Sequence, residues 1–120
     1  MKVLVTGPKD ITAAETVVTI VSTLANLHLS KRITELIVNG DHEGCTELVR
    51  DWGKRSKIAI REFRSLEGDG KNAPYFRDKR MAQACDMAVL FATEGKGKAT
   101  RFMRNLCKKN GVKVMEVKAA

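Results

Sequence analysis

Residues 3–40 read VLVTGPKDITAAETVVTIVSTLANLHLSKRITELIVNG, and in this stretch two short apolar runs flank a helical pattern. Val3-Leu4-Val5 and Leu36-Ile37-Val38 are continuously apolar, which is typical of strands buried on both faces of a sheet. Between them, apolar residues recur at helical spacing from about Thr12, where Thr12-Ala13-Ala14-Glu15 has the form of a capping box. A strand, a helix and a strand in this order predict a parallel pair joined by a right-handed crossover.

The alternation of strands and helices continues through the rest of the chain. The further predicted elements are helices from about Gly44, over residues 74–84 and after residue 98, and strands at residues 58–60, 87–91 and 112–117. We therefore predict an α/β fold in a single domain, residues 1–120. Its architecture is a Rossmann-like three-layer sandwich of about five parallel strands in the order 3-2-1-4-5.

The composition favours a folded protein without a membrane segment. Of the 120 residues, 43% are hydrophobic and 30% are charged, a balance that supports a packed core and argues against intrinsic disorder. The longest apolar stretch, residues 17–29, is interrupted by polar side chains, and no signal-peptide pattern follows Met1. Cys45, Cys85 and Cys107 lack the C-x-x-C spacing of zinc or redox sites, which favours buried reduced thiols. We therefore expect a cytoplasmic protein.

The chain is strongly basic. It has 22 Lys and Arg residues against 14 Asp and Glu residues, which gives a formal net charge of +8. Such an excess attracts polyanions, including nucleic acid and phosphate-bearing ligands. A basic surface that only keeps the protein in solution explains the same charge, so both interpretations remain open.

The predicted strand order places a topological switch point between the first and fourth strands, and ligands of such sheets bind there, outside the carboxyl ends of the strands. After the first strand come Thr6, Gly7, Lys9 and Asp10. Gly7 permits a tight turn, and Lys9 can reach an anionic group over the sheet edge. The dinucleotide fingerprint G-x-G-x-x-G is absent from this turn, so ordinary turn chemistry is an equal alternative.

After the second strand, Gly40 and Gly44 flank a predicted helix start. Glycines here let backbone N–H groups approach a phosphate, helped by the helix dipole. Asp41 and Glu43 oppose an anion at this position, but their carboxylates can accept hydrogen bonds from ribose hydroxyls. Asp41, His42 and Glu43 also raise the idea of a metal site. Because three consecutive loop residues rarely ligate one ion, we expect no metal and no cofactor.

The segment Gly95-Lys96-Gly97-Lys98-Ala99-Thr100 follows the predicted fourth strand. Glycines ahead of a helix N-terminus, with lysines between them and a hydroxyl in the first turn, are typical of a phosphate cradle. The segment is not a Walker A loop, because Ala92 stands where that motif needs glycine. A kinase or ATPase is therefore not supported.

Arg77 and Arg80 lie at the start of the third predicted helix. Residues three apart share a helix face, so the two guanidinium groups can act on one anion. A solvated basic turn, which also contains Lys79, is the alternative interpretation.

Taken together, these segments resemble the SLOG superfamily, the Rossmann-like group named after Smf/DprA and LOG proteins, and within it the small YspA-like family. The similarity covers nearly the whole chain, in four blocks whose order and spacing agree. Residues 3–10 resemble the family's opening strand and its turn ending in Arg-Asp; residues 36–52 resemble its second strand, glycine turn and helix; residues 77–81 resemble its Arg-Asn-x-x-Met helix start; and residues 95–100 resemble its glycine-lysine turn closed by Gly-Thr. The resemblance implies nucleotide sensing, and related domains often pair.

The chain departs from the family pattern inside these blocks. Lys9 replaces the usual Arg, Asp41 stands where a second glycine is common, Thr46 replaces an Asp, and Ala99 replaces the Gly before Thr100. LOG enzymes, which cleave the N-glycosidic bond of nucleoside monophosphates, carry a glutamate just after their Gly-Thr. Arg101 follows Thr100 in this chain, so the resemblance favours binding without turnover.

Three functions remain as hypotheses. The favoured one is binding of a nucleotide or an ADP-ribose-like ligand by the strand-end residues named above together with Arg77 and Arg80. The second is non-specific nucleic-acid binding through a basic helix face, as in the DprA proteins, by Lys96, Lys98, Arg101, Arg104, Lys108 and Lys109. The third is hydrolysis of a nucleotide N-glycosidic or phosphate bond, with a carboxylate from Glu94, Asp10 or Glu43.

Two expectations concern surfaces. Most of the aromatic residues are predicted to lie in the core, with Phe102, Met103 and Leu106 of the last helix pointing inward. Stacking platforms for nucleic-acid bases are therefore expected to be scarce. The helix over residues 12–29 carries enough apolar surface to contribute to a homo-oligomer.

Overall fold

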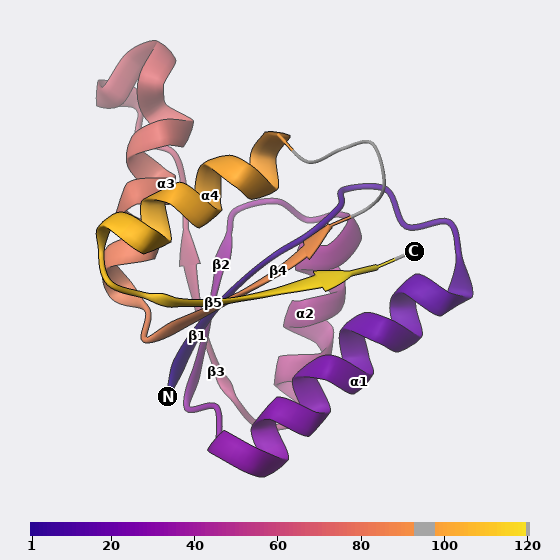
Figure 1. Ribbon diagram of the computed structural model, residues 1–120. Helices are drawn as coiled ribbons and strands as arrows, with labels where there is room; N and C mark the ends of the chain where they lie inside the picture. The colour runs from indigo at the N-terminus through magenta and orange to yellow at the C-terminus, as the bar shows by residue number, and fades with distance from the viewer. Residues whose placement is uncertain (93–97, 120) are drawn as a thin grey trace.

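The computed structural model describes residues 1–92 and 98–119 (Figure 1). Its elements are β1 (Lys2–Thr6), α1 (Ala14–Lys31), β2 (Glu35–Asn39), α2 (Gly44–Arg55), β3 (Ala59–Phe63), the 3₁₀ helix η1 (Glu67–Asn72), α3 (Ala73–Ala84), β4 (Met87–Ala92), α4 (Lys98–Lys109) and β5 (Lys113–Lys118). The strands form a five-stranded sheet in the order β3-β2-β1-β4-β5, and each neighbouring pair is parallel. The predicted fold class and strand order are confirmed.

In the register of the sheet, the apolar runs predicted as the first, second and fourth strands lie side by side. Leu4 at the centre of β1 pairs with Ile37 of β2 and with Ala88 of β4. All three residues are fully buried, because helices cover both faces of the sheet at this point.

Side-chain alternation along the strands divides the core into two clusters. Val3 and Val5 belong to the cluster under α1 and α2, whereas Leu4 between them belongs to the cluster under α3 and α4. Figure 1 shows α1 and α2 on one side of the sheet and α3 and α4 on the other. This three-layer arrangement follows from right-handed crossovers that run in opposite directions from β1.

Two local predictions are wrong. The capping box does not form, because α1 begins at Ala14 with Ala13 as its N-cap residue. Residues 11–13 remain outside the helix while Ile11 packs against the core. Phe102 does not point inward either: its side chain is 37% exposed, since the buried stripe of α4 is formed by Met103, Leu106 and Cys107. The inward positions predicted for Met103 and Leu106 are confirmed.

The three cysteines are buried and carry free thiols, as the sequence predicts. Burial raises the pKa of the Cys45 thiol to about 12, which leaves it protonated and unreactive at neutral pH. Among residues 1–92 and 98–119, no helix combines the length and the apolar character needed to span a membrane.

Candidate functional site

A cavity of about 560 Å³ opens where β1, β2 and β4 end. Thr6, Asn39 and Ala92, the last residues of these three strands, all contribute to its lining. It therefore lies at the switch point between β1 and β4, the position at which sheets of this topology bind ligands. We call it the switch-point cavity.

Close packing fixes the β1–α1 turn that borders the cavity. A Cβ atom at Gly7 would lie 2.5 Å from Sγ of Cys45 and 3.2 Å from Cβ of Phe91, so the site accepts glycine and resists larger residues. The backbone N–H of Cys45 donates to the carbonyl of Pro8 at 2.9 Å. Gly44 has φ of +58°, and its Cα passes so close to Lys9 that a Cβ would lie 2.2 Å from the Lys9 carbonyl oxygen. These contacts fasten the turn to the start of α2.

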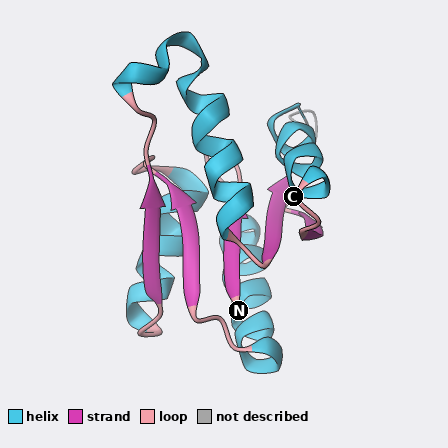
Figure 2. Ribbon diagram, turned by 90° about the vertical axis from the view of Figure 1, so that its left-hand side faces the viewer, coloured by secondary structure: helices cyan, strands magenta, loops and turns pink. Residues whose placement is uncertain are grey.

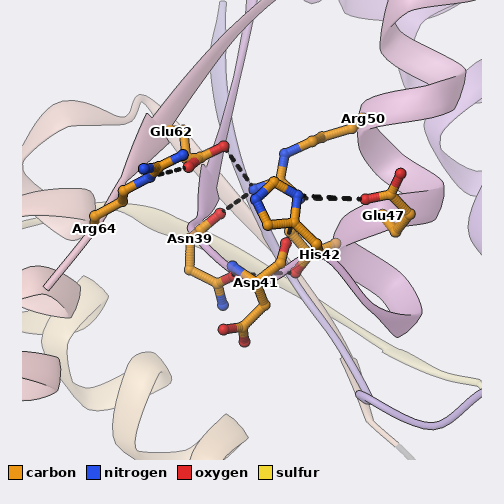
Figure 3. Close-up of polar contacts among 8 residues, drawn as sticks. Asn39, Asp41, His42, Glu47, Arg50, Glu62 and Arg64 are labelled. Carbon is orange, nitrogen blue, oxygen red and sulfur yellow. Dashed lines mark hydrogen bonds and ion pairs between the residues drawn. The ribbon is translucent and has the colours of Figure 1, made fainter.

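The β2–α2 turn forms the second wall, and the nearly buried side chain of Arg50 holds it in place (Figure 3). Nη2 of Arg50 donates to the Asn39 carbonyl at 2.7 Å and to the Glu62 carboxylate at 2.8 Å, and Nη1 donates to the Asp41 carbonyl. The hydrogen bonds from Arg64 and Arg50 keep the pKa of Glu62 below its ordinary value, so this carboxylate stays ionised. The guanidinium group of Arg50 thus joins α2, β2 and β3.

Asn39 connects this support to the cavity. Its side-chain carbonyl oxygen accepts hydrogen bonds from the backbone N–H of Asp41 at 2.9 Å and from the Thr46 hydroxyl at 3.3 Å. Asn39, Asp41 and Thr46 all line the cavity. A turn tied at both its backbone and its side chains presents these polar groups in a fixed arrangement.

Each of the two cations that line the cavity lies beside a carboxylate. Arg77 lies at 2.9 Å from the Asp78 carboxylate, and Lys9 lies at 3.9 Å from the Asp41 carboxylate. Burial raises the pKa of Asp78 above its ordinary value; the Arg77 charge opposes this rise, and the Asp41 charge adds to it. The arrangement therefore offers both donors for an anion and carboxylate acceptors for hydroxyl groups.

The structure brings together about half of the predicted site residues. The predicted residues that line the switch-point cavity are Thr6, Gly7, Lys9, Asp10, Arg77 and Thr100. Gly40 lies instead against Arg64, and Gly44 lines a neighbouring groove with Glu47 and Asp51. Gly95, Lys96 and Gly97 fall outside the described residues, as does Glu94, and Lys98 is the first residue of α4.

Arg80 lies away from the cavity. Its guanidinium donates to the Asp69 carboxylate of η1 at 3.3 Å, whereas Arg77 on the same helix lines the cavity. The predicted joint action of the two arginines on one anion is not supported by these positions.

Several residues at the cavity were not predicted as ligand-binding residues. Asn39 and Asp78 are the clearest cases. Asp41 and Glu43 also line the cavity, where we expect them, from the sequence, to repel an anion and to accept hydrogen bonds from ribose hydroxyls. A signal for Asn39 exists, because it directly follows the predicted strand over residues 36–38 at the switch-point edge. Arg50 gives no comparable signal, because a residue one position after Val49 lies about 100° further around the helix, and the burial of Arg50 is seen only in the structure.

In residues 1–92 and 98–119, no group of three His, Cys, Asp or Glu side chains is placed to hold an ion. The polar groups that line the cavity can form hydrogen bonds and ion pairs.

No family model, curated protein or solved structure matches the chain.

Proposed function

We propose that the switch-point cavity binds a nucleotide or a nucleotide-derived ligand such as ADP-ribose, without turnover. The observation that carries the proposal is the presence of Lys9 and Arg77 beside four carboxylates in one cavity at the strand ends. The cations can receive phosphate oxygens, and the carboxylates can accept hydrogen bonds from ribose hydroxyls.

The first turn of α4 adds to this support. Ala99 and Thr100 line the cavity, so the first turn of α4 borders the place where the ligand would lie. Backbone N–H groups at the N-terminal end of a helix attract anions. The resemblance to YspA-like SLOG proteins points to the same class of ligand, and pairing with a second copy and a cytoplasmic location remain part of the proposal.

Calorimetric titration with AMP, ADP, ADP-ribose and NAD tests the proposal. We expect at least one of these ligands to bind with a dissociation constant below about 1 mM. Arg77→Gln should weaken that binding roughly 10-fold or more, because it removes a charge-assisted contact. Arg55→Gln removes the same charge from the last turn of α2, where the side chain is exposed, and should leave binding unchanged.

The same solutions are assayed for release of the nucleobase. Binding without release supports a binding module, whereas release that depends on Asp10, Glu43 or Asp78 would replace it with the hydrolase alternative. The absence of binding by the whole panel, or equal binding by Arg77→Gln and the unmodified chain, would reject the proposed function.

A further inference from the structure

Three aromatic side chains lie together on the surface of the α3–α4 layer. Tyr75, Phe76 and Phe102 are 39%, 39% and 37% exposed. The ring of Tyr75 contacts both of the others, with centroid distances of 5.4 Å to Phe76 and 5.5 Å to Phe102. The expectation that most aromatic residues are buried is wrong for these three, which we call the aromatic surface.

The aromatic surface lies near the carboxyl edge of the sheet. Tyr75 and Phe76 belong to the first turn of α3, which extends beyond the strand ends in Figure 2, and Phe102 belongs to the start of α4. The cavity is close by along the chain, because Pro74 and Arg77 line it and flank this pair of rings. Tyr75, Phe76 and Phe102 are not among its lining residues, so the surface is a separate feature.

Cationic side chains accompany these rings. Lys79 follows Tyr75 by four positions on α3, and Lys109 follows Phe102 by seven positions on α4, spacings that keep each pair on one helix face. Both lysines are exposed, as is Asn105 between Phe102 and Lys109. The sequence of α4, KATRFMRNLCKK, contains five cationic residues and no acidic residue.

We propose that the aromatic surface binds single-stranded nucleic acid, with bases stacked on Tyr75 and Phe102 and phosphates near Lys79 and Lys109. Base stacking on aromatic rings combined with a basic track is the usual chemistry of binding without sequence preference. Single strands fit better than duplexes, because a ring can stack only on a base whose face is not already covered by its neighbours in a helix.

Charge favours this occupant over a second copy of the chain. A two-fold interface formed by the aromatic surface would bring Lys79 and Lys109 of one copy close to the same residues of the other. The repulsion would add to a net charge of +8 on each chain, whereas a polyanion neutralises both.

Fluorescence anisotropy with a labelled oligo-dT of about 15 nucleotides at low salt tests the proposal, since this length covers the usual site. Tyr75→Ala and Phe102→Ala should each weaken binding about 5- to 150-fold, the range that corresponds to the loss of one stacked base. Tyr75→Phe and Phe102→Tyr keep the rings and should bind like the unmodified chain. Leu29→Ala removes a side chain that is 85% exposed on α1, across the sheet, and should have no effect.

The salt dependence separates the lysines from the rings. The slope of log affinity against log salt is negative, and Lys79→Gln and Lys109→Gln should each make it less steep by about 0.7, the value for one phosphate contact on a single strand. Tyr75→Ala and Phe102→Ala should lower the affinity at every salt concentration without changing the slope. Thermal melts followed by circular dichroism verify that each variant is folded.

Three results would overturn the proposal. The first is oligo-dT binding that the ring variants leave unchanged, or that a duplex of equal length matches. The second is a concentration-dependent dimer, measured by light scattering, that Tyr75→Ala or Phe102→Ala dissociates while oligo-dT does not bind. The third is a result in which the unmodified chain binds oligo-dT no more tightly than a mononucleotide and the ring variants lose mononucleotide binding. That result would assign the rings to the cavity ligand. Arg77→Gln, which tests the cavity, is expected to retain oligo-dT binding, so the two proposals fail independently.

Discussion

At the scale of the residue, Asp78 shows how burial and pairing compete inside the cavity. Its side chain is 17% exposed, and its carboxylate lies beside Arg77, a pairing that by itself would favour ionisation. Burial outweighs this pairing, and the charge of Asp41 works in the same direction as burial, so the pKa of Asp78 is raised. The folded chain therefore holds a proton on Asp78 at pH values where the unfolded chain has lost it.

This shift predicts how stability changes with pH. A carboxyl group whose pKa is higher in the folded state makes stability fall as the pH rises from its ordinary value of 3.8 through the raised value. Asp78→Asn removes the titration, so the melting temperature of the variant relative to the unmodified chain should increase between about pH 3.5 and pH 7. Calorimetric melts across this range measure it. Asp51→Asn on the exposed side of α2 is the control, and an Asp78→Asn difference that stays flat or declines would show that the Arg77 pairing dominates.

At the scale of the element, the second wall of the cavity depends on one side chain that crosses from a helix to two strands. Arg50 extends from α2 to carbonyl groups at the end of β2 and to Glu62 of β3 (Figure 3). Its planar guanidinium reaches these acceptors at once, which the single ammonium of lysine cannot do. The turn that presents Asn39 and Asp41 is therefore set by α2 as much as by its own sequence.

Arg50→Lys should destabilise the protein by roughly 1–3 kcal/mol, because it keeps the charge but leaves buried acceptors without donors. Urea unfolding followed by the fluorescence of Trp52 measures the loss. The matched variant Arg55→Lys changes the same helix at a side chain that is 78% exposed, where the ion pair with Asp51 contributes less than about 0.5 kcal/mol. Equal free energies of unfolding for the two variants would contradict the role given to Arg50.

At the scale of the whole molecule, Ala119, the residue that follows β5, connects the end of the sheet to α1. Ala119 is fully buried, its N–H donates to the Ala92 carbonyl at 2.8 Å, and its carbonyl accepts a hydrogen bond from the Thr16 hydroxyl at 3.1 Å. These contacts link the first helix to β4 and to the end of the last strand, and the hydrogen bond from Thr16 to Ala119 joins residues 103 positions apart in the sequence. The carboxyl edge of the sheet is therefore held together beside the cavity.

Ala119→Asp should lower the free energy of unfolding by roughly 2–4 kcal/mol, because it places a carboxylate in the core. Lys118→Asp introduces the same side chain one residue earlier, at an exposed position, and should cost less than about 0.5 kcal/mol. Chemical denaturation of the two variants distinguishes them. A small effect at both positions would mean that Ala119 does not contribute to closure of the fold.

The sequence by itself determined the strand order, the start of α2 at Gly44 and the edge of the sheet that carries the cavity. These features depend on apolar runs, helical spacing and the handedness of crossovers, all of which are local or general properties of the chain. Thr6, Gly7, Lys9 and Asp10 could be placed at the cavity for the same reason, since they directly follow β1.

Only the tertiary structure decided where neighbouring side chains of one helix lie: in the cavity, in the core or on the surface. Arg77 lines the cavity while Arg80 pairs with Asp69, and Phe102 lies beside Tyr75 on the surface while Met103 is buried. Helical spacing gives the direction of a side chain around the helix axis to within about a third of a turn. It does not give which other element that side chain meets. The crossing of α3 over α4, and of both over the sheet, settles that choice because packing fixes where each helix face points.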